Sequence, residues 1–507
     1  MRIQRALAVV VLGLVGAAGC SGDDGGGSET ASTEPASTET ATTTEPPGAD
    51  VAVPTAVGPI EGGEYGVPYN PMPGGLAEEF GYTEEEYFIS GVATSYTPRG
   101  ELGTDGVWAV RPADTAPYTT RILVRRPVDA ADFNGTVLVE WLNVTAGRDS
   151  DPMFGFLHRL LMEEGYAYVG VSAQATGVQG GGPTLEVPGV PEVALLPLQQ
   201  WDPERYADLD HPGDEFSYDM FSQVAQLLRR PGEVDPLDGL AVTHLLGAGE
   251  SQSSGRLATY LNAVQPVADI YDGFLVHSRG AEAAPLNADP NLVMPEPANL
   301  RTDIGAPALQ FESETDLVFL GHLDGRQDDS DSVVTWEVAG AAHADASTLV
   351  YGRASGEVWL PGSNADPTAQ CGTINDGPQA PVLRATFSAL DAWVVDGTPP
   401  PTSGDIESEG GELVRDDLGN VVGGIRTPPV DAPVSALRGD NSSGSVFCSL
   451  FGTETPFTRA QLAELYTDHD DYVAEVTASA DAAVEAGFLL PADRDSFVAD
   501  AETAHVP

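Results

Sequence analysis

Lysine is absent from this 507-residue chain, whose 23 basic residues are all arginine. Without lysine the protein cannot form a Schiff base with a carbonyl substrate, and it cannot use a Ser-Lys catalytic dyad. It also lacks the residue that binds nucleotide phosphates in a P-loop. The sequence alone therefore excludes these three kinds of chemistry.

Positive charge is scarce overall. Acidic residues number 77 against 23 basic ones, which gives a formal net charge of −54. Nucleic acids and anionic lipid headgroups bind basic surfaces, so the acidic balance argues against binding of either through charge. A solubilising acidic surface explains the imbalance, and such a surface also disfavours strongly anionic substrates.

The N-terminus has the features of a targeting segment. Two arginines precede the apolar run Ala6–Val15, which is too short for an ordinary transmembrane helix, and Ala17–Cys20 resembles a bacterial lipobox. We therefore expect a lipoprotein signal peptide over 1–19 and lipidation of Cys20. Residues 20–52 are rich in Ser, Thr, Glu, Pro and Gly, which predicts a disordered tether. The protein is expected to be exported and lipid-anchored to the cell envelope, with simple secretion as the alternative.

The chain has three cysteines and no C-x-x-C or H-E-x-x-H motif, so we predict no metal site. With Cys20 assigned to lipidation, Cys371 and Cys448 remain. In an exported protein an isolated pair most simply forms one disulfide. Two free buried thiols are the alternative.

The stretch L-L-G-A-G-E-S-Q-S-S-G, residues 245–255, is the most informative in the chain. An apolar strand precedes it, and apolar residues at helical spacing follow it over 256–264. A strand, a tight turn carrying a serine, and a helix make a nucleophile elbow, with Ser251 as the nucleophile. The usual pattern is G-x-S-x-G, and Ser253 replaces the second glycine here. The alternative is a Ser/Gly-rich turn in which Ser253 or Ser254 caps the next helix.

Candidate partners for Ser251 follow in the order acid, then histidine. The short apolar strand 307–311 leads into Glu312, Glu314 and Asp316, and the strand 333–338 leads to His343. This is the chain order of the triad in α/β-hydrolases. We expect Asp316 to be the acid because it lies furthest beyond its strand, and Glu314 is the alternative.

An oxyanion hole is expected from backbone N–H groups at two places. One is the residue after the nucleophile, Gln252, and the other lies in the loop after the strand 135–143. Val144 is the favoured donor in that loop, with Asn143 next. An ordinary strand-to-helix turn is the alternative interpretation of this loop.

Apolar strands alternate with helical patterns through the middle of the chain, which predicts βαβ units and a mostly parallel sheet. We expect a domain over 53–507 with large loop insertions at about 174–214 and 279–304, the first of them lid-like. A C-terminal helical extension is expected over about 352–507. The expected strands are 86–96, 118–126, 135–143, 166–173, 270–277, 307–311 and 333–338, and the expected helices include 154–161, 216–230, 381–395, 458–466 and 470–486, with a hairpin at 413–426.

The chain resembles a family of bacterial α/β-hydrolase-domain proteins that are often exported and whose substrates are largely unassigned. The motifs that carry the resemblance are 246–255, which begins like a carboxylesterase Gly-Glu-Ser elbow, 313–316, 336–345, 211–223 and 419–426. The resemblance implies an α/β-hydrolase fold and hydrolase chemistry, with Ser251, Asp316 and His343 as nucleophile, acid and base.

These observations predict a serine hydrolase that cleaves small-molecule carboxylic esters through an acyl-enzyme and needs no cofactor. One alternative is a catalytically silent surface binding protein with the same fold, because fold does not guarantee activity. A serine peptidase or amidase is the other. The oligomeric state, the natural substrate and the behaviour of a lid are left open by the sequence.

Overall fold

The computed structural model describes residues 48, 51–362 and 366–506, which belong to one compact unit. The expected signal peptide, Cys20 and almost all of the expected tether lie outside the described residues. No helix in the described ranges has both the length and the apolar character needed to cross a bilayer.

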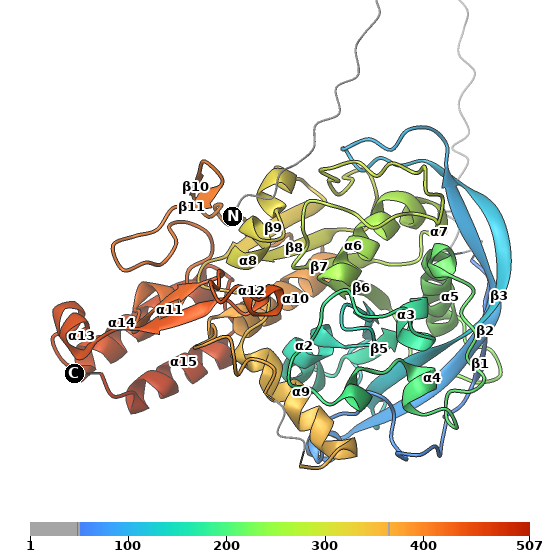
Figure 1. Ribbon diagram of the computed structural model, residues 1–507, viewed down its shortest axis with the longest axis horizontal. Helices are drawn as coiled ribbons and strands as arrows, with labels where there is room; N and C mark the ends of the chain where they lie inside the picture. The colour runs from blue at the N-terminus through green and yellow to red at the C-terminus, as the bar shows by residue number, and fades with distance from the viewer. Residues whose placement is uncertain (1–47, 49–50, 363–365, 507) are drawn as a thin grey trace, which may run out of the picture. The chain divides into compact units, whose positions relative to one another are not determined.

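Among the described residues, the central sheet has nine strands in the order β1-β2-β3-β5-β4-β6-β7-β8-β9. It can be followed in Figure 1 from the long blue strands β2 and β3 to the yellow strand β9. The bounds are β1 (Thr55–Val57), β2 (Tyr82–Pro98), β3 (Val110–Pro127), β4 (Thr136–Trp141), β5 (Ala167–Val171), β6 (His244–Glu250), β7 (Gly273–His277), β8 (Ala308–Ser313) and β9 (Val333–Val338).

The strands β4 to β9 pair in parallel, whereas β1, β2 and β3 pair antiparallel, and β3 joins the parallel part by an antiparallel pairing with β5. Every residue of β4, β5, β7 and β8 is buried, as in a parallel sheet covered on both faces. The predicted mostly parallel sheet is confirmed. The carboxyl ends of β4, β6, β8 and β9 lie at one edge, so the loops that follow them meet there.

Helices cover both faces of the sheet and divide the core in two. Neighbouring strand residues point to opposite faces, so Val137 belongs to one apolar cluster and Leu138 to the other. The first cluster contains α5 (Ser217–Arg229), α6 (Gln252–Thr259), the π-helical turn η3 (Tyr260–Val264) and α7 (Gln265–Ala268). The second contains α2 (Pro152–Glu163) and α10 (Gln379–Asp396). This layering confirms the predicted fold class.

The loops hold several short elements. The expected insertion at 174–214 contains α3 (Ala175–Val178), η1 (Glu192–Leu195) and α4 (Leu198–Trp201), and η2 (Asp214–Phe216) begins at its end. The stretch 279–304 has no helix or strand. The remaining elements before the end of β9 are α1 (Leu76–Phe80), α8 (Glu314–Val318) and η4 (His322–Gly325).

The C-terminal extension is helical, as predicted. Besides α10, its elements are α9 (Ala346–Trp359), β10 (Ser408–Glu409), β11 (Glu412–Leu413), α11 (Pro428–Asp431), β12 (Ser435–Arg438), α12 (Val446–Leu450), β13 (Thr453–Pro456), α13 (Arg459–Leu465), α14 (His469–Glu485) and α15 (Pro491–Thr503). The expected hairpin at 413–426 turns at Asp416–Asn420, where the Asp416 N–H donates to the Asn420 carbonyl oxygen at 2.8 Å and Arg415 forms an antiparallel bridge with Val421.

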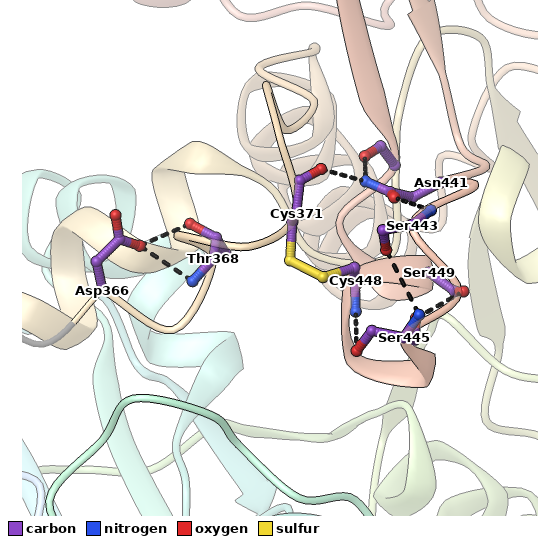
Figure 2. The surroundings of a disulfide bond; sticks show 9 residues. Asp366, Thr368, Cys371, Asn441, Ser443, Ser445, Cys448 and Ser449 are labelled. Atoms are coloured by element: carbon purple, nitrogen blue, oxygen red, sulfur yellow. Dashed lines mark hydrogen bonds between the residues drawn. A yellow bond between two sulfur atoms is a disulfide. The ribbon is translucent and has the colours of Figure 1, made fainter.

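Cys371 and Cys448 form a disulfide, as predicted, with a Cα–Cα distance of 5.2 Å. Figure 2 shows that it joins the segment after α9 to the short helix α12. Asn441 Nδ2 also donates to the Cys371 carbonyl oxygen at 3.1 Å. The bond therefore holds two parts of the extension together beside the loop that follows β9.

Candidate active site

Ser251 lies in the turn between β6 and α6, with φ 56° and ψ −119°. This backbone conformation is unfavourable for a residue with a side chain, and it persists only where the surroundings enforce it. Here the Ser251 N–H donates to the carbonyl oxygen of His277 on β7 at 3.0 Å. The strained strand–turn–helix geometry is that of a nucleophile elbow.

The structure explains why the small residues Gly249 and Ser253 flank Ser251. A Cβ on Gly249 would lie 2.8 Å from the Ser253 carbonyl oxygen, so only glycine fits there. Ser253 does not cap the helix, as the alternative interpretation of this turn proposed. Its Oγ donates to the Glu250 carbonyl oxygen at 2.8 Å and accepts from the Glu250 N–H at 3.0 Å. The Ser253 hydroxyl thus bonds both the N–H and the carbonyl oxygen of Glu250 at this turn.

His343 follows β9, and its ring is held by Asp316. The distance from His343 Nδ1 to Asp316 Oδ1 is 2.6 Å, and the Asp316 side chain is fully buried. The His343 backbone N–H also donates to Thr315 Oγ1 at 3.1 Å. The start of α8 and the loop after β9 therefore meet through Thr315, Asp316 and His343.

Asp316 lies beyond the end of β8, in the first turn of the short helix α8. Its Oδ2 accepts the Ser313 N–H at 2.7 Å, and its own N–H donates to Ser313 Oγ at 3.4 Å, which forms a capping box. One carboxylate oxygen is thus used for the helix start and the other for His343. The acid is fixed by its own helix.

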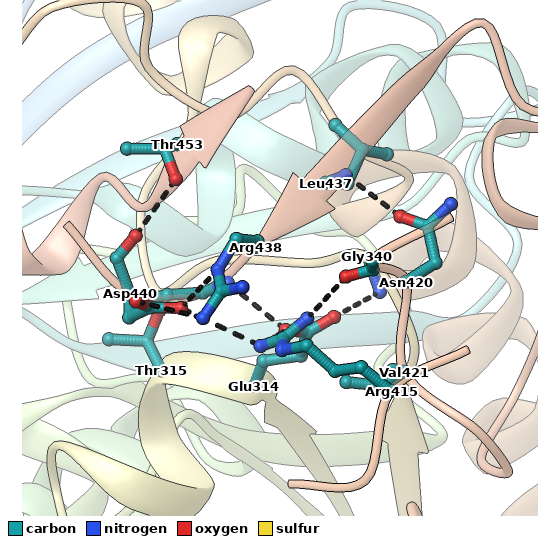
Figure 3. A network of polar contacts seen from close by, with 12 residues as sticks. Glu314, Thr315, Gly340, Arg415, Asn420, Val421, Leu437, Arg438, Asp440 and Thr453 are labelled. Carbon is teal, nitrogen blue, oxygen red and sulfur yellow. Dashed lines mark hydrogen bonds and ion pairs between the residues drawn. The ribbon is translucent and has the colours of Figure 1, made fainter. Parts of the chain in front are cut away.

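Glu314, the alternative acid, binds elsewhere. Its carboxylate accepts from Gly340 N–H at 2.8 Å, from Arg415 Nη2 at 2.8 Å and from Gly439 N–H at 3.1 Å. Figure 3 shows this network, in which Glu314 lies between the turn carrying Arg415 and the end of β12. Glu314 therefore connects α8 to the C-terminal extension, and its carboxylate oxygens are already bonded there rather than to His343.

The predicted oxyanion donors differ in their bonding. Gln252 N–H lies at the start of α6, where no acceptor exists within the helix. Val144 N–H lies 3.5 Å from Gln252 Oε1, a long contact with a movable side chain. Asn143 N–H instead donates to the Ser150 carbonyl oxygen at 2.9 Å. Among the described residues the Gln252 N–H thus has no acceptor, the Val144 N–H is covered by the Gln252 side chain, and the Asn143 N–H is occupied.

Glu250 is a site residue that the sequence analysis did not identify. Its Oε1 lies 3.2 Å from His343 Nε2, and its Oε2 accepts from Asn143 Nδ2 at 3.0 Å. Within the described part of the chain, no hydrogen bond joins the Ser251 hydroxyl to His343. The only signal in the sequence was the acidic residue directly before Ser251.

Burial and paired charges set the titration of these groups. Burial raises the pKa of Asp316, but the charge of His343 and the bonds from His343 and Ser313 outweigh it and leave the pKa below its usual value. Burial lowers the pKa of His343, whereas Asp316 and then Glu250 raise it, and the net direction is upward. Burial raises the pKa of Glu250 to about 7, although the His343 charge opposes the change.

A cavity of about 320 Å³ is lined by residues of α2, α9 and the loops around them. Its wall is mainly apolar and aromatic and comes from α2, the 187–194 loop, α9 and α12, with Tyr69, Phe156, Val187, Val190, Leu349, Tyr351, Trp359, Phe447 and Phe451 among its residues and Asn70, Arg148, Asp151 and Thr348 among its polar groups. The insertion that the sequence indicated as lid-like therefore supplies one side of the cavity.

Ser251 and His343 are not among the residues that line the cavity, and its wall is linked to them only through neighbouring residues. The Phe156 ring packs edge to face on His277 with centroids 5.4 Å apart, and His277 is the residue whose carbonyl oxygen binds the Ser251 N–H. On the other side, the Ala344 N–H donates to the Leu450 carbonyl oxygen of α12 at 2.9 Å. The cavity wall is thus linked to the elbow through His277 and to the loop of His343 through α12.

Comparison with protein families gives a match over most of the chain. A family model described as an alpha/beta hydrolase domain matches residues 56–499. No curated protein matches the chain.

Solved structures that match the chain include several esterases, all at low identity and low TM-score. Esterase Est22 is 13% identical, with 55% of this chain and 78% of that chain covered and a TM-score of 0.27. Acetyl xylan esterase 1 from Thermoanaerobacterium sp. JW/SL YS485 is 10% identical, with 57% and 95% covered and a TM-score of 0.28. A fungal esterase from Rhizomucor miehei is 12% identical, with 54% and 83% covered and a TM-score of 0.25. We base no inference about activity on similarity at this level.

Proposed function

The chain belongs to the alpha/beta hydrolase domain family, and from this premise we propose that it is a serine hydrolase that cleaves carboxylic esters. The observation that carries the proposal is the placement of His343 on Asp316, at 2.6 Å, beside the strained turn of Ser251. A histidine oriented by a buried carboxylate and a partly exposed serine on an elbow are the parts that acyl transfer requires.

The proposed reaction follows from these positions. His343 accepts the Ser251 proton at Nε2, because Nδ1 is occupied by Asp316. Ser251 Oγ attacks the ester carbonyl carbon, and the N–H groups of Gln252 and Val144 bind the oxyanion once the Gln252 side chain moves away from Val144. His343 then gives its proton to the leaving alcohol. Water, activated by the same histidine, hydrolyses the acyl-enzyme and restores Ser251.

The cavity supports an ester with an apolar or aromatic group as substrate. Six aromatic side chains line it among other mostly apolar residues, and its volume of about 320 Å³ is at the lower end for ligand sites. Gly356 lies on this wall in α9, and a Cβ there would meet open space. We expect Gly356→Phe to reduce kcat/KM for aryl or long-chain esters more than for acetate esters, with Gly356→Ala as the matched control for helix propensity. Equal effects on both kinds of ester would contradict the assignment of the cavity.

Labelling with a fluorophosphonate probe tests the proposed function directly. Soluble protein beginning near Ala52 should form an adduct on Ser251, identified by mass spectrometry, and Ser251→Ala should abolish it. His343→Ala should slow the labelling, whereas Ser254→Ala is the matched control in the same turn. A folded protein that forms no adduct would favour the silent binding protein instead. Hydrolysis of amides at rates similar to esters would favour the peptidase alternative.

Export and lipid anchoring through Cys20 complete the proposal. They depend on the lipobox-like sequence and on the disulfide between Cys371 and Cys448, which is typical of proteins outside the cytoplasm. The full-length protein is expected to partition into detergent, and Cys20→Ala to release it into the aqueous phase. Aqueous partition of the unmodified full-length protein would contradict the anchor.

A further inference from the structure

The Glu250 carboxylate faces the nitrogen on which the proposed mechanism depends. His343 Nε2 must accept the Ser251 proton, yet its neighbour in the structure is Glu250 Oε1 at 3.2 Å. The carboxylate is held in this position from its other side by Asn143 Nδ2, which also donates to the Glu250 carbonyl oxygen at 3.0 Å. The Glu250 carboxylate therefore lies between His343 and Asn143 and contacts both.

The number of protons in this contact is limited. Asp316 binds Nδ1, so the Nδ1 proton points away from Glu250. If Nε2 and the carboxylate were both unprotonated, two acceptors would face each other in a buried site, which is unfavourable. The contact is stable when one proton lies between them, either on Glu250 or on His343. With that proton present, Nε2 cannot accept another from Ser251.

We propose that Glu250 is a positioning residue that holds the resting His343 through one shared proton, and that loss of this proton to solvent makes the enzyme active. The proposal rests on the proposed function. When His343 later takes the Ser251 proton, the resulting imidazolium again donates to the Glu250 carboxylate. Glu250 thus sets the pH at which activity begins and also stabilises the charge that forms on His343 during the reaction.

The charged and titratable groups around this contact are few. His343 faces Asp316 from α8 and Glu250 from β6, and the neighbouring His277 on β7 is fully buried. Burial lowers the pKa of His277 to about 3, so this imidazole stays neutral. Burial raises the pKa of Glu250 to about 7, which agrees with a proton held near neutral pH. Asp316 is ionised throughout this range, since its pKa lies below the usual value.

The pH dependence of kcat/KM for an acetate ester, followed by titration of the released acid, tests the proposal. In the unmodified enzyme kcat/KM should fall on the acid side with a midpoint near 7. In Glu250→Gln the carboxylate no longer favours protonated His343, so the midpoint should move down by about one pH unit or more. The plateau at high pH should also fall, by about tenfold, because the imidazolium loses its facing charge.

Two further variants make the test decisive. Glu140→Gln is the matched control: Glu140 is buried in β4 but binds Met153 N–H, Phe154 N–H and Tyr168 instead of His343. It should leave the acid midpoint unchanged. Glu250→Asp keeps a carboxylate and should move the midpoint less than Glu250→Gln, and it serves if the latter does not fold. An unchanged midpoint in folded Glu250 variants would overturn the inference. Absence of fluorophosphonate labelling at every pH would instead overturn the proposed function.

Discussion

Two amide substitutions distinguish the carboxylates of α8, beginning with Asp316→Asn. The Ser313 N–H is buried and needs an acceptor, so the asparagine oxygen should stay where Oδ2 now accepts it at 2.7 Å. The amide NH₂ group then faces His343 Nδ1, which must become an acceptor. The imidazole proton moves to Nε2, and His343 can no longer accept the proton of Ser251. We expect kcat to fall by about 10⁴-fold with little change in stability, since both contacts remain bonded.

Glu314→Gln should instead lower the stability and leave kcat nearly unchanged. The amide oxygen of the glutamine can still accept from the Gly340 N–H. Its NH₂ group would then face two donors, Arg415 Nη2 and the Gly439 N–H. This leaves buried donors without an acceptor and Arg415 without its nearest carboxylate. We expect a loss of about 3 kcal/mol in the free energy of unfolding, because one partner of a buried ion pair is removed. The kcat of the folded protein should stay near that of the unmodified enzyme.

Both quantities can be measured on the same samples. Urea unfolding followed by tryptophan fluorescence gives the free energy of unfolding, and hydrolysis of an acetate ester at saturation gives kcat. The reasoning fails if Asp316→Asn keeps kcat within about tenfold of the unmodified enzyme. It also fails if Glu314→Gln lowers kcat by more than about tenfold and yet unfolds at the same urea concentration as the unmodified enzyme.

Three substitutions in the elbow have distinct expected outcomes. Ser253→Gly restores the usual G-x-S-x-G pattern but removes the hydroxyl that bonds Glu250, and should lower the free energy of unfolding by about 1–3 kcal/mol in urea titrations. Gly249→Ala places a methyl group 2.8 Å from the Ser253 carbonyl oxygen and should abolish fluorophosphonate labelling; normal labelling would show that the turn can relax. Gln252→Ala keeps its N–H group and frees Val144, so kcat/KM should stay within about tenfold, whereas a loss of about 100-fold would mean that the side chain itself is needed.

The buried strands and the order of the site residues could be predicted from the sequence. The strand ending at Trp141 is a near-continuous apolar run, and such runs are typical of a parallel sheet covered on both faces. Because parallel strands end at one edge, Ser251, Asp316 and His343 were expected to meet once their strands were identified. The structure brings these three segments together.

The missed elements lack a clear apolar pattern. Helix α9 buries only Tyr351 and Ser355, and α15 buries only Asp493 and Ala501, so neither has the apolar stripe by which a helix is recognised. The ends of β2 and β3 were also missed, since they extend into partly exposed antiparallel pairing where polar residues are tolerated.

Contacts between distant side chains could not be predicted. The approach of Glu250 to His343 joins residues on β6 and after β9, and nothing in the local pattern determines where either side chain points. The role of Glu314 is similar, because its partners Arg415 and Gly439 lie in the extension. Glu250 directly precedes Ser251, and Glu314 lies two residues before Asp316. Only the three-dimensional arrangement shows that Glu250 contacts His343 and that Glu314 binds the extension.

The disulfide between Cys371 and Cys448 has a consequence for limited proteolysis. The covalent loop that it closes includes α10, which packs on the sheet, and the stretch 397–411, which is largely exposed apart from Pro400 and Ile406. A protease that cuts this stretch leaves two fragments joined by the sulfur–sulfur bond, each still anchored by its own packing. The nicked chain would migrate as one band on a gel without reductant and as two bands with it, so cleavage in this segment goes unnoticed unless the sample is reduced.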